Sequence, residues 1–497
     1  MVSRARNAVP NDVLHNLRDA AGQTQQDVAD AINRLAVHRK RGGVITANQV
    51  SRWERGVTYP SPLHRQLLAE HFGVSLEQLG LTRPRMIVPA IGTREPGVEA
   101  FSLQEDGQMA PGPDVERSQA QWRAVRRGLN QHRAHLAREA ARLYDPSVRV
   151  GETGLLAAPE WLPRSPVELR DLRITRSPDV PEPEILGTED AAAKTWPLSG
   201  DGRRHQRYSL ALRDVEQPRL LENRLAWRLT GVGWSARDST LSFGIGTYFS
   251  GLDIGETLAH EMAASHLMGD GGGTRPATWR GLAFRRLLGD PLSLLRTPVI
   301  ASVDTLTLRR DEDGVSFVLH NRSSGRVAVA GGMLHIMPSG VFQPSSVLPA
   351  AQLADFDLWR NMVREYSEEF LGNAEHGGEG EPADFDAPPL AALQRAYADG
   401  EVRAFCLGVA RDALTLWGEI LTVAVFDGPA YDRLFADMVR VNDEGAVVQT
   451  GRTKPTSALP FTRQVIEDLL AGGRLAPAAA GCLELAWQHR RAILDRS

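Results

Sequence analysis

The residues from Thr46 to Gly56 combine an apolar stripe with side chains that can read DNA bases. Thr46 is a good N-cap and Gly56 stands where a left-handed helix end is wanted, so this segment predicts a short helix. Ala47, Val50 and Trp53 recur at helical spacing and would form its buried side. The opposite side carries the residue types that fork two hydrogen bonds onto adenine or guanine edges, namely Asn48, Gln49, Arg52 and Arg55. The segment is a candidate major-groove probe, although polar residues opposite an apolar stripe are also normal on a surface helix.

Short helices are also predicted on both sides of this segment, at about 12–21, 24–35, 63–72 and 75–79. Together with the segment from Thr46 they make five helices. The spacing of these helices and of the capping, glycine and proline residues between them resembles the lambda-repressor/Cro-like (XRE-type) helix-turn-helix family over about the first 80 residues. The matching residues are Leu17, Arg18, Gly22, Thr24 and Gln25, then Ser51 to Gly56, then Pro60, Gly73, Val74, Ser75, Gln78 and Leu79.

The resemblance implies a five-helix, all-α DNA-binding domain at residues 8–82, which we call the head, and double-stranded DNA as its partner. In that family the helix from Thr46 would be the recognition helix, and Gln25 at the start of the second helix would contact phosphate. Arg18 and Glu54 match a pair that ties the first helix to the third. Because such heads gain affinity from paired half-sites, a homodimer is expected.

The link between the second and third helices is longer than the family's turn of a few residues. It runs from Ala36 to Ile45 and contains Arg39, Lys40 and Arg41 beside two glycines. These cations could contact phosphates, which position a protein without reading sequence, or the link could be a solvated insertion. We favour the phosphate contacts.

Charge is distributed unevenly along the 497 residues. Residues 1–85 hold 12 Lys and Arg against 7 Asp and Glu, a net +5, which leaves −9 for the remainder of a chain of net charge −4. A basic head on an acidic remainder suits a DNA contact at one end. Cys406 and Cys482 stand far apart in apolar surroundings, which predicts buried reduced thiols. With no signal peptide and no membrane-length apolar run, we expect a cytoplasmic, nucleoid-associated protein that contacts no membrane.

After the head, composition predicts a linker at 83–113, a long amphipathic helix at 114–145, an α+β middle region at 146–296 and an α/β domain with C-terminal helices at 297–497. We call residues 146–497 the body. The long helix is rich in arginine. It could pack on the body, pair with a second copy as a dimer stalk, or offer DNA a second surface, and packing with a solvated basic face is the favoured alternative.

Three glutamates in the last third of the chain stand at metal-ligand spacing. Glu365, Glu368 and Glu369 fall at i, i+3 and i+4, so a regular helix would gather their carboxylates on one face. Hard divalent cations such as Mg²⁺ prefer such oxygen ligands. A solvated acidic face is the simpler explanation of a bare pattern of this kind.

The surrounding residues resemble the core of the Nudix box, Arg-Glu-apolar-x-Glu-Glu, here Arg364 to Glu369 with Gly372 close behind. The resemblance implies a mixed sheet between helices, three glutamates ligating Mg²⁺ across a diphosphate, and water attacking the pyrophosphate linkage. The family also places a Glu and a Gly upstream of this core, where the present chain has Phe356 and Ala350. Those departures favour binding of a ligand over its hydrolysis.

The sequence therefore predicts a multidomain, sequence-specific transcriptional regulator whose Nudix-like body senses a small, diphosphate-type or nucleotide-like ligand, with Mg²⁺ as the implied cofactor. The main alternative is a Mg²⁺-dependent Nudix-type nucleoside-diphosphate hydrolase with a DNA-localising head. A third alternative is an interaction protein whose head binds another protein.

Overall fold

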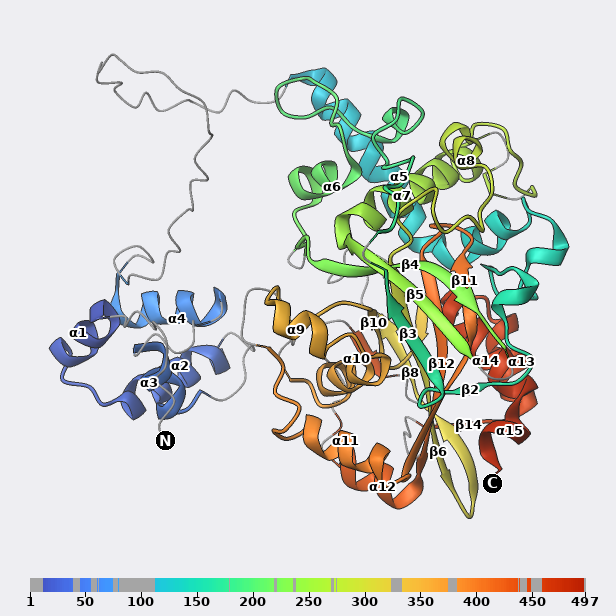
Figure 1. The fold of residues 1–497 in the computed structure, drawn as a ribbon. Coiled ribbons are helices and arrows are strands. Elements are labelled where there is room, and N and C mark those ends of the chain that lie inside the picture. Colours follow the sequence, from blue (N-terminus) through green and yellow to red (C-terminus); the bar gives the residue numbers. More distant parts are fainter. Residues whose placement is uncertain are drawn as a thin grey trace. The chain divides into compact units, whose positions relative to one another are not determined.

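The structure is a computed structural model of the chain. It describes residues 12–38, 45–54, 60, 62–74, 79, 112–177, 179–218, 221–235, 238–269, 272–273, 275–322, 333–373, 382–436, 438, 445–447 and 458–495. The chain divides into two compact units, Met1–Asp106 and Gly107–Ser497 (Figure 1). Residues 83–111 of the predicted linker, and 75–78 of the predicted fifth head helix, lie outside the described residues.

The head is helical where it is described. Its helices are α1 (Asp12–Ala20), α2 (Gln25–His38), α3 (Ala47–Glu54) and α4 (Pro62–Phe72). They enclose one small apolar core to which Leu14 of α1, Val28 of α2, Val50 of α3 and Leu67 of α4 each contribute a fully buried side chain. Packing of these apolar faces, more than intrinsic propensity, stabilises helices this short.

A mixed sheet forms the centre of the second unit. Its strands run in the order β1-β11-β12-β6-β7-β14, with β10 paired to β6 and β2 to β11. The bounds are β1 (Leu155–Leu156), β2 (Val167–Glu168), β6 (Ala301–Asp311), β7 (Gly314–Phe317), β10 (Ser339–Val341), β11 (Val402–Asp412), β12 (Gly418–Asp427) and β14 (Leu459–Pro460). β6 runs parallel to β12, and β11 runs antiparallel to β12. The predicted α+β class with a mixed sheet is confirmed.

Helices cover both faces of this sheet, as Figure 1 shows. On one side lie α10 (Leu358–Glu365), α11 (Leu390–Ala398) and α12 (Gly428–Leu434), and on the other lies α14 (Pro477–Gln488). Tyr366, which follows α10 directly, reaches the sheet through a 2.7 Å hydrogen bond between its hydroxyl and that of Thr307 on β6. On the opposite face, α14 comes so close that a Cβ at Gly481 would meet Leu155 at 2.4 Å.

Two smaller sheets flank the central one. They run in the orders β3-β5-β4 and β13-β8-β9. Their bounds are β3 (Leu172–Arg176), β4 (Leu225–Gly233), β5 (Ser239–Thr247), β8 (Leu319–Arg322), β9 (Leu334–Ile336) and β13 (Gly445–Val447). The remaining helices are α6 (Tyr208–Ala211), α7 (Tyr248–His266), α8 (Ala283–Leu288), α9 (Pro349–Ala354), α13 (Arg463–Ala471) and α15 (Arg490–Leu494).

One strand expected from the sequence is divided in the structure. The apolar pattern over 314–321 predicts a single strand paired with the one before it, but only β7 pairs with β6. After Val318 the chain continues as β8, which pairs with β9 and β13 in a different sheet. Alternation of apolar residues continues across the break, so the pattern alone does not reveal it.

The long arginine-rich helix is α5 (Pro113–Ala141), and it packs on the body. Two of its arginines, Arg126 and Arg133, are buried and donate hydrogen bonds of 2.8–3.0 Å to the carboxylate of Glu256 on α7. The Arg126 guanidinium also donates to the hydroxyl of Tyr208 on α6 at 2.9 Å. Of the alternatives for this helix, the structure therefore shows packing on the body, but the expected solvated basic face is wrong for Arg126 and Arg133, which are buried against a carboxylate.

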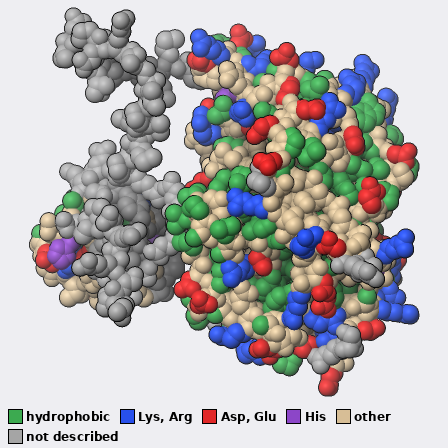
Figure 2. Space-filling model, in the orientation of Figure 1, with side chains coloured by type: hydrophobic (Ala, Val, Ile, Leu, Met, Phe, Trp, Pro, Cys, Tyr) green, Lys and Arg blue, Asp and Glu red, His purple; other side chains and the backbone are tan. Residues whose placement is uncertain are grey.

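On the face of the second unit seen in Figure 2, basic and acidic side chains are interspersed, without a continuous basic tract among the described residues. Both cysteines are buried free thiols, as expected, and burial raises the pKa of Cys406 to about 12 and raises that of Cys482 as well. Among the described helices, none is both long and apolar enough to cross a membrane.

Candidate functional site

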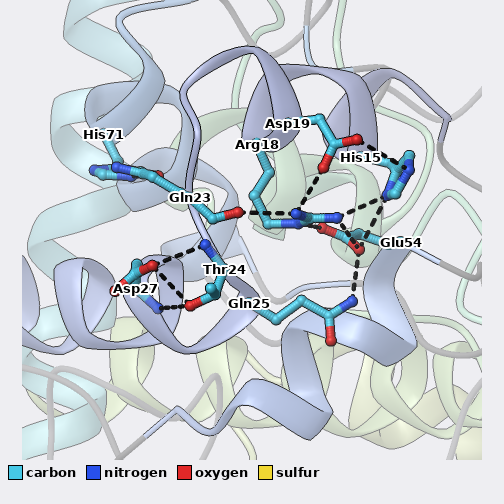
Figure 3. Close-up of polar contacts among 9 residues, drawn as sticks. All are labelled: His15, Arg18, Asp19, Gln23, Thr24, Gln25, Asp27, Glu54 and His71. Atoms are coloured by element: carbon cyan, nitrogen blue, oxygen red, sulfur yellow. Dashed lines mark hydrogen bonds and ion pairs between the residues drawn. The ribbon is translucent and has the colours of Figure 1, made fainter.

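A buried carboxylate at the C-terminal end of α3 joins three helices of the head (Figure 3). Glu54 is 5% exposed, accepts a hydrogen bond from Nε of Arg18 on α1 at 2.5 Å, and accepts another from Nε2 of Gln25 on α2 at 2.7 Å. Burial would raise the pKa of Glu54, but the hydrogen bonds from Arg18 and Gln25 outweigh burial and leave the pKa below its usual value. The predicted tie between Arg18 and Glu54 is therefore confirmed, and it carries full charge at neutral pH.

The guanidinium of Arg18 makes further contacts that the sequence analysis missed. It donates to Nδ1 of His15 and to the backbone oxygen of Gln23, each at 2.9 Å. His15 stands three residues before Arg18, on the same face of α1, which is the signal that identifies it in the sequence. The Glu54 hydrogen bond raises the pKa of Arg18, so the guanidinium also stays charged.

α2 begins at a reciprocal cap. The backbone N–H and the hydroxyl of Thr24 both donate to Oδ2 of Asp27, at 2.8 and 2.7 Å, and the Asp27 N–H donates back to the Thr24 hydroxyl at 3.2 Å. Gln25 follows Thr24 directly, which places it at the positive end of α2 as expected. Its amide nitrogen is engaged by Glu54 in this structure.

α3 begins at a second reciprocal cap, which uses a residue predicted to contact bases. The Thr46 N–H donates to Oε1 of Gln49 at 2.9 Å, and the Gln49 N–H approaches the Thr46 hydroxyl at 3.4 Å. Val50 is fully buried and Trp53 is 5% exposed, with its ring 5.6 Å from that of His64 on α4. The predicted inward stripe is confirmed at Val50 and Trp53, whereas Ala47 is half-buried, and the side-chain oxygen Oε1 of Gln49 holds the start of the helix.

In the second unit, two of the three box glutamates converge on strand β10. Oε1 of Glu369 accepts a hydrogen bond from the Ser339 backbone N–H at 3.4 Å. The Glu365 carboxyl lies close against Gly340: a Cβ atom added at Gly340 would lie only 2.2 Å from Oε1 of Glu365. Glu368 is half-buried, while Glu369 is buried. α10 continues from Tyr366 to Phe370 as a π-helical turn, so the regular i, i+3, i+4 arrangement expected for these carboxylates does not hold.

A fourth carboxylate near β10 was not singled out in the sequence. Asp304 of β6 is 1% exposed and accepts a 2.7 Å hydrogen bond from the Ser339 hydroxyl. Among the described residues no group of three or more His, Cys, Asp or Glu side chains is arranged to hold a metal ion. The magnesium site expected from the sequence stays a prediction.

Comparison with known proteins identifies the head. Residues 14–79 match the helix-turn-helix family model. This part of the chain is a helix-turn-helix domain. No curated protein sequence matches the chain. A solved Nudix hydrolase from Alicyclobacillus acidocaldarius is similar over 37% of this chain and 90% of its own, at 16% identity and a TM-score of 0.20, too low a score to support an argument about the second unit.

The match supports a DNA-binding transcription regulator. Within the helix-turn-helix domain the structure places Gln49 and the backbones of Asn48 and Arg52 on α3, with Thr46 directly before it as the cap. The Asn48 and Arg52 side chains, the residues 39–41 and Arg55 lie outside the described residues, so their predicted DNA contacts stay predictions.

Proposed function

We propose that the chain is a sequence-specific DNA-binding transcriptional regulator that reads bases with α3. The observation that carries the proposal is the anchoring of α3 by Val50 and Trp53. At 100° per residue, positions 48 and 52 of a helix buried at 50 and 53 fall on the opposite side. A short helix fixed by its apolar face, with Asn and Arg at the opposite positions, has the arrangement of a major-groove reader.

The experiment substitutes those two positions. Arg52→Ala and Asn48→Ala should each weaken binding to the preferred duplex, found by selection from random sequences, by about 1–3 kcal/mol. Binding to a scrambled duplex should change much less after Asn48→Ala, since base contacts specify while phosphate contacts position. Gln66→Ala, at an exposed position on α4, is the matched control. Unchanged preference in both test variants would refute the assignment of α3.

We also propose that the regulator binds DNA as a homodimer. A single head of this size makes few base contacts, and two heads on paired half-sites gain affinity by linkage. Sedimentation of the full chain with duplexes carrying one or two half-sites tests this. A complex of one chain per two-site duplex at saturation would contradict it.

For the body we propose binding of a diphosphate-type metabolite, aided by Mg²⁺, with slow turnover or none. Support comes from Glu365 and Glu369, which both approach β10, and from the box-like residues around them. Placing a cation, water and leaving group together demands more than a partial set of carboxylates, so binding without catalysis is the expected outcome. A regulator uses a ligand that favours one of its states over the other.

Calorimetry with Mg²⁺ and a panel of nucleoside diphosphates and nucleotide-sugars tests this second proposal. Binding should be lost in Glu368→Gln/Glu369→Gln and kept in Glu312→Gln, which removes an exposed acid from the β6–β7 turn. Rapid hydrolysis that disappears in the double variant would establish the hydrolase alternative. If no panel member binds, the proposal for the body is wrong and the glutamates have only a structural role.

A further inference from the structure

The long link between α2 and α3 raises the question of what holds the start of the recognition helix. In a helix-turn-helix with a turn of three or four residues, covalent geometry alone restricts where the third helix begins. Here α2 ends at His38 and α3 begins at Ala47. A link of that length fixes the relative placement of its two ends less than a short turn does, and it is tolerated because the entropy of closing a loop rises only slowly with its length.

One side chain of α2 bridges the two helices directly. The Asn33 amide donates from Nδ2 to the backbone oxygen of Ile45 at 2.8 Å, and its Oδ1 accepts from the Ile45 backbone N–H at 2.7 Å. The backbone N–H and C=O of Ile45 are thus both hydrogen-bonded to the Asn33 side-chain amide, as they would be to the backbone of a neighbouring strand. The Ile45 side chain is 3% exposed and belongs to the same core as the fully buried Ile32.

The position of this pairing matters because Ile45 immediately precedes the α3 cap, Thr46. The middle and the C-terminal end of α3 have other attachments: Val50 and Trp53 enter the core, and Glu54 binds Arg18 and Gln25. At the N-terminal end, the Thr46–Gln49 cap closes the helix on itself and does not fasten it to α2. The Asn33 amide supplies that polar attachment.

We propose that Asn33 is a positioning residue for DNA recognition, which ties Ile45 to α2 and fixes the angle at which α3 enters the major groove. This inference rests on the proposed function of α3. Positions 48 and 52 lie between the Asn33 and Glu54 attachments, so loss of one attachment lets the helix tilt about the other. Base contacts require hydrogen-bond geometry within a few tenths of an ångström, whereas phosphate contacts tolerate displacement. Asn33 therefore governs discrimination between sequences more than overall affinity.

The same attachment makes the placement of α3 independent of the insertion. α2 extends to His38 and not only to residue 35 as expected. Since Asn33 secures Ile45, a change at 39–44 need not move α3. Neutralising the loop cations and removing the Asn33 amide should then produce different defects. Neutralising the cations lowers affinity for every duplex, and removing the Asn33 amide lowers the preference for the selected duplex.

The experiment uses the full chain with Asn33→Leu, which removes both hydrogen bonds at similar volume, and Asn33→Asp, which keeps the acceptor but sets a carboxylate against the Ile45 carbonyl. Gln26→Leu, an amide-to-leucine change at an exposed position of α2, is the matched control. Affinities for the selected duplex and a scrambled one are measured at one salt concentration. Amide hydrogen exchange is followed in peptides covering 12–20 and 45–54.

We expect both Asn33 variants to lower the ratio of selected to scrambled affinity at least tenfold, with the control within twofold of wild type. Amide hydrogen exchange should accelerate in the peptide 45–54, which contains α3, and stay unchanged in the peptide 12–20, which contains α1. An unchanged ratio in both variants would overturn the inference. If that unchanged ratio comes with an equal loss of affinity for both duplexes and with faster amide exchange in 12–20, Asn33 serves only the stability of the head. If the wild-type chain prefers no duplex, the proposed function itself fails, and that outcome is distinct from the other two.

Discussion

Replacing Glu54 with Gln tests whether the buried ion pair holds the head together. The change keeps the size of the side chain and removes its charge, so the Arg18 guanidinium loses the partner at 2.5 Å. The side chains of Arg18 and Glu54 are only 10% and 4% exposed, so water replaces the lost contact poorly. Removing one partner of a buried pair typically costs about 3–5 kcal/mol, because the other charge is left uncompensated.

The low end of that range is expected here. Arg18 would keep its hydrogen bonds to the Gln23 backbone oxygen and to Oδ1 of Asp19, both at 2.9 Å. We therefore expect a loss of about 3 kcal/mol in the free energy of unfolding of the head. For a domain of roughly 60–100 residues, that corresponds to a fall of about 12–24 °C in its melting temperature.

Hydrogen exchange of the full chain measures this loss without isolating the head. Amides of α1 to α3 that open only with the whole head should exchange about 100-fold faster in Glu54→Gln, since 1.4 kcal/mol is a factor of ten. Glu70→Gln, an exposed position on α4, removes the same charge and should change exchange little. The double variant Arg18→Met/Glu54→Leu leaves no orphaned charge and should regain most of the loss. Equal effects of Glu54→Gln and Glu70→Gln would refute the reasoning.

The same carboxylate gives the head a dependence on pH. The folded-state pKa of Glu54 is below its usual value, so its contribution to stability is complete above the ordinary pKa of glutamate. That contribution should be lost as the pH falls through the lowered folded-state value. Protection of α1 to α3 should therefore decrease less steeply with acidification in Arg18→Met/Glu54→Leu than in the wild-type chain.

Two further predictions concern the insertion and the long helix. Neutralising the cations at 39–41 should lower affinity for every duplex and flatten the salt dependence by about 0.9 per lost phosphate contact, whereas an unchanged slope would mean that the insertion is solvated. In the second unit, Glu256→Gln should destabilise the packing of α5 on α7 by about 3 kcal/mol or more in chemical denaturation, because Arg126 and Arg133 are buried against that carboxylate. Glu222→Gln, an exposed acid of the same unit, should have almost no effect, and equal effects of the two would contradict this prediction.

The parts of the head that could be predicted from sequence are those determined by local signals. Thr24 and Thr46 cap their helices, and Val50 and Trp53 point inward, because caps and helical periodicity act over a few residues. The Arg18–Glu54 contact joins residues 36 positions apart, and it is predicted from the family resemblance, not from residue spacing.

The uses of two glutamine side chains could not be predicted in the same way. In the sequence, Gln25 and Gln49 carry amides that could face DNA or the protein. The structure engages the Gln25 nitrogen with Glu54 and the Gln49 oxygen with the Thr46 N–H. The amide nitrogen of glutamine has two N–H donors, so Gln25 keeps a second N–H that can donate to a phosphate oxygen, and the Gln49 nitrogen remains to donate to a base edge.

In the body, prediction failed at the same point for strands and for glutamates. An apolar pattern continues through Val318 although the strand changes sheets there, and the acidic pattern continues through Glu368 although the helix widens at Tyr366. Periodicity records which residues are buried, and each break has buried side chains on both sides: Phe317 and Leu319 in the strands, Val363 and Phe370 in the helix. What changes is the long-range partner, such as Thr307 for Tyr366, and a single sequence carries no local trace of it.

The arginines of α5 show why charge composition and function must be separated. Counted along the sequence they suggest a second DNA surface, yet Arg126 and Arg133 are buried against Glu256, 130 and 123 residues away. Arg123 and Arg138 donate instead to backbone oxygens of Val215 and Gly473. A guanidinium with five donors suits such contacts, because it can satisfy several carbonyl or carboxylate oxygens at once. Most of this positive charge therefore stabilises the second unit, and the DNA-binding argument rests on the head.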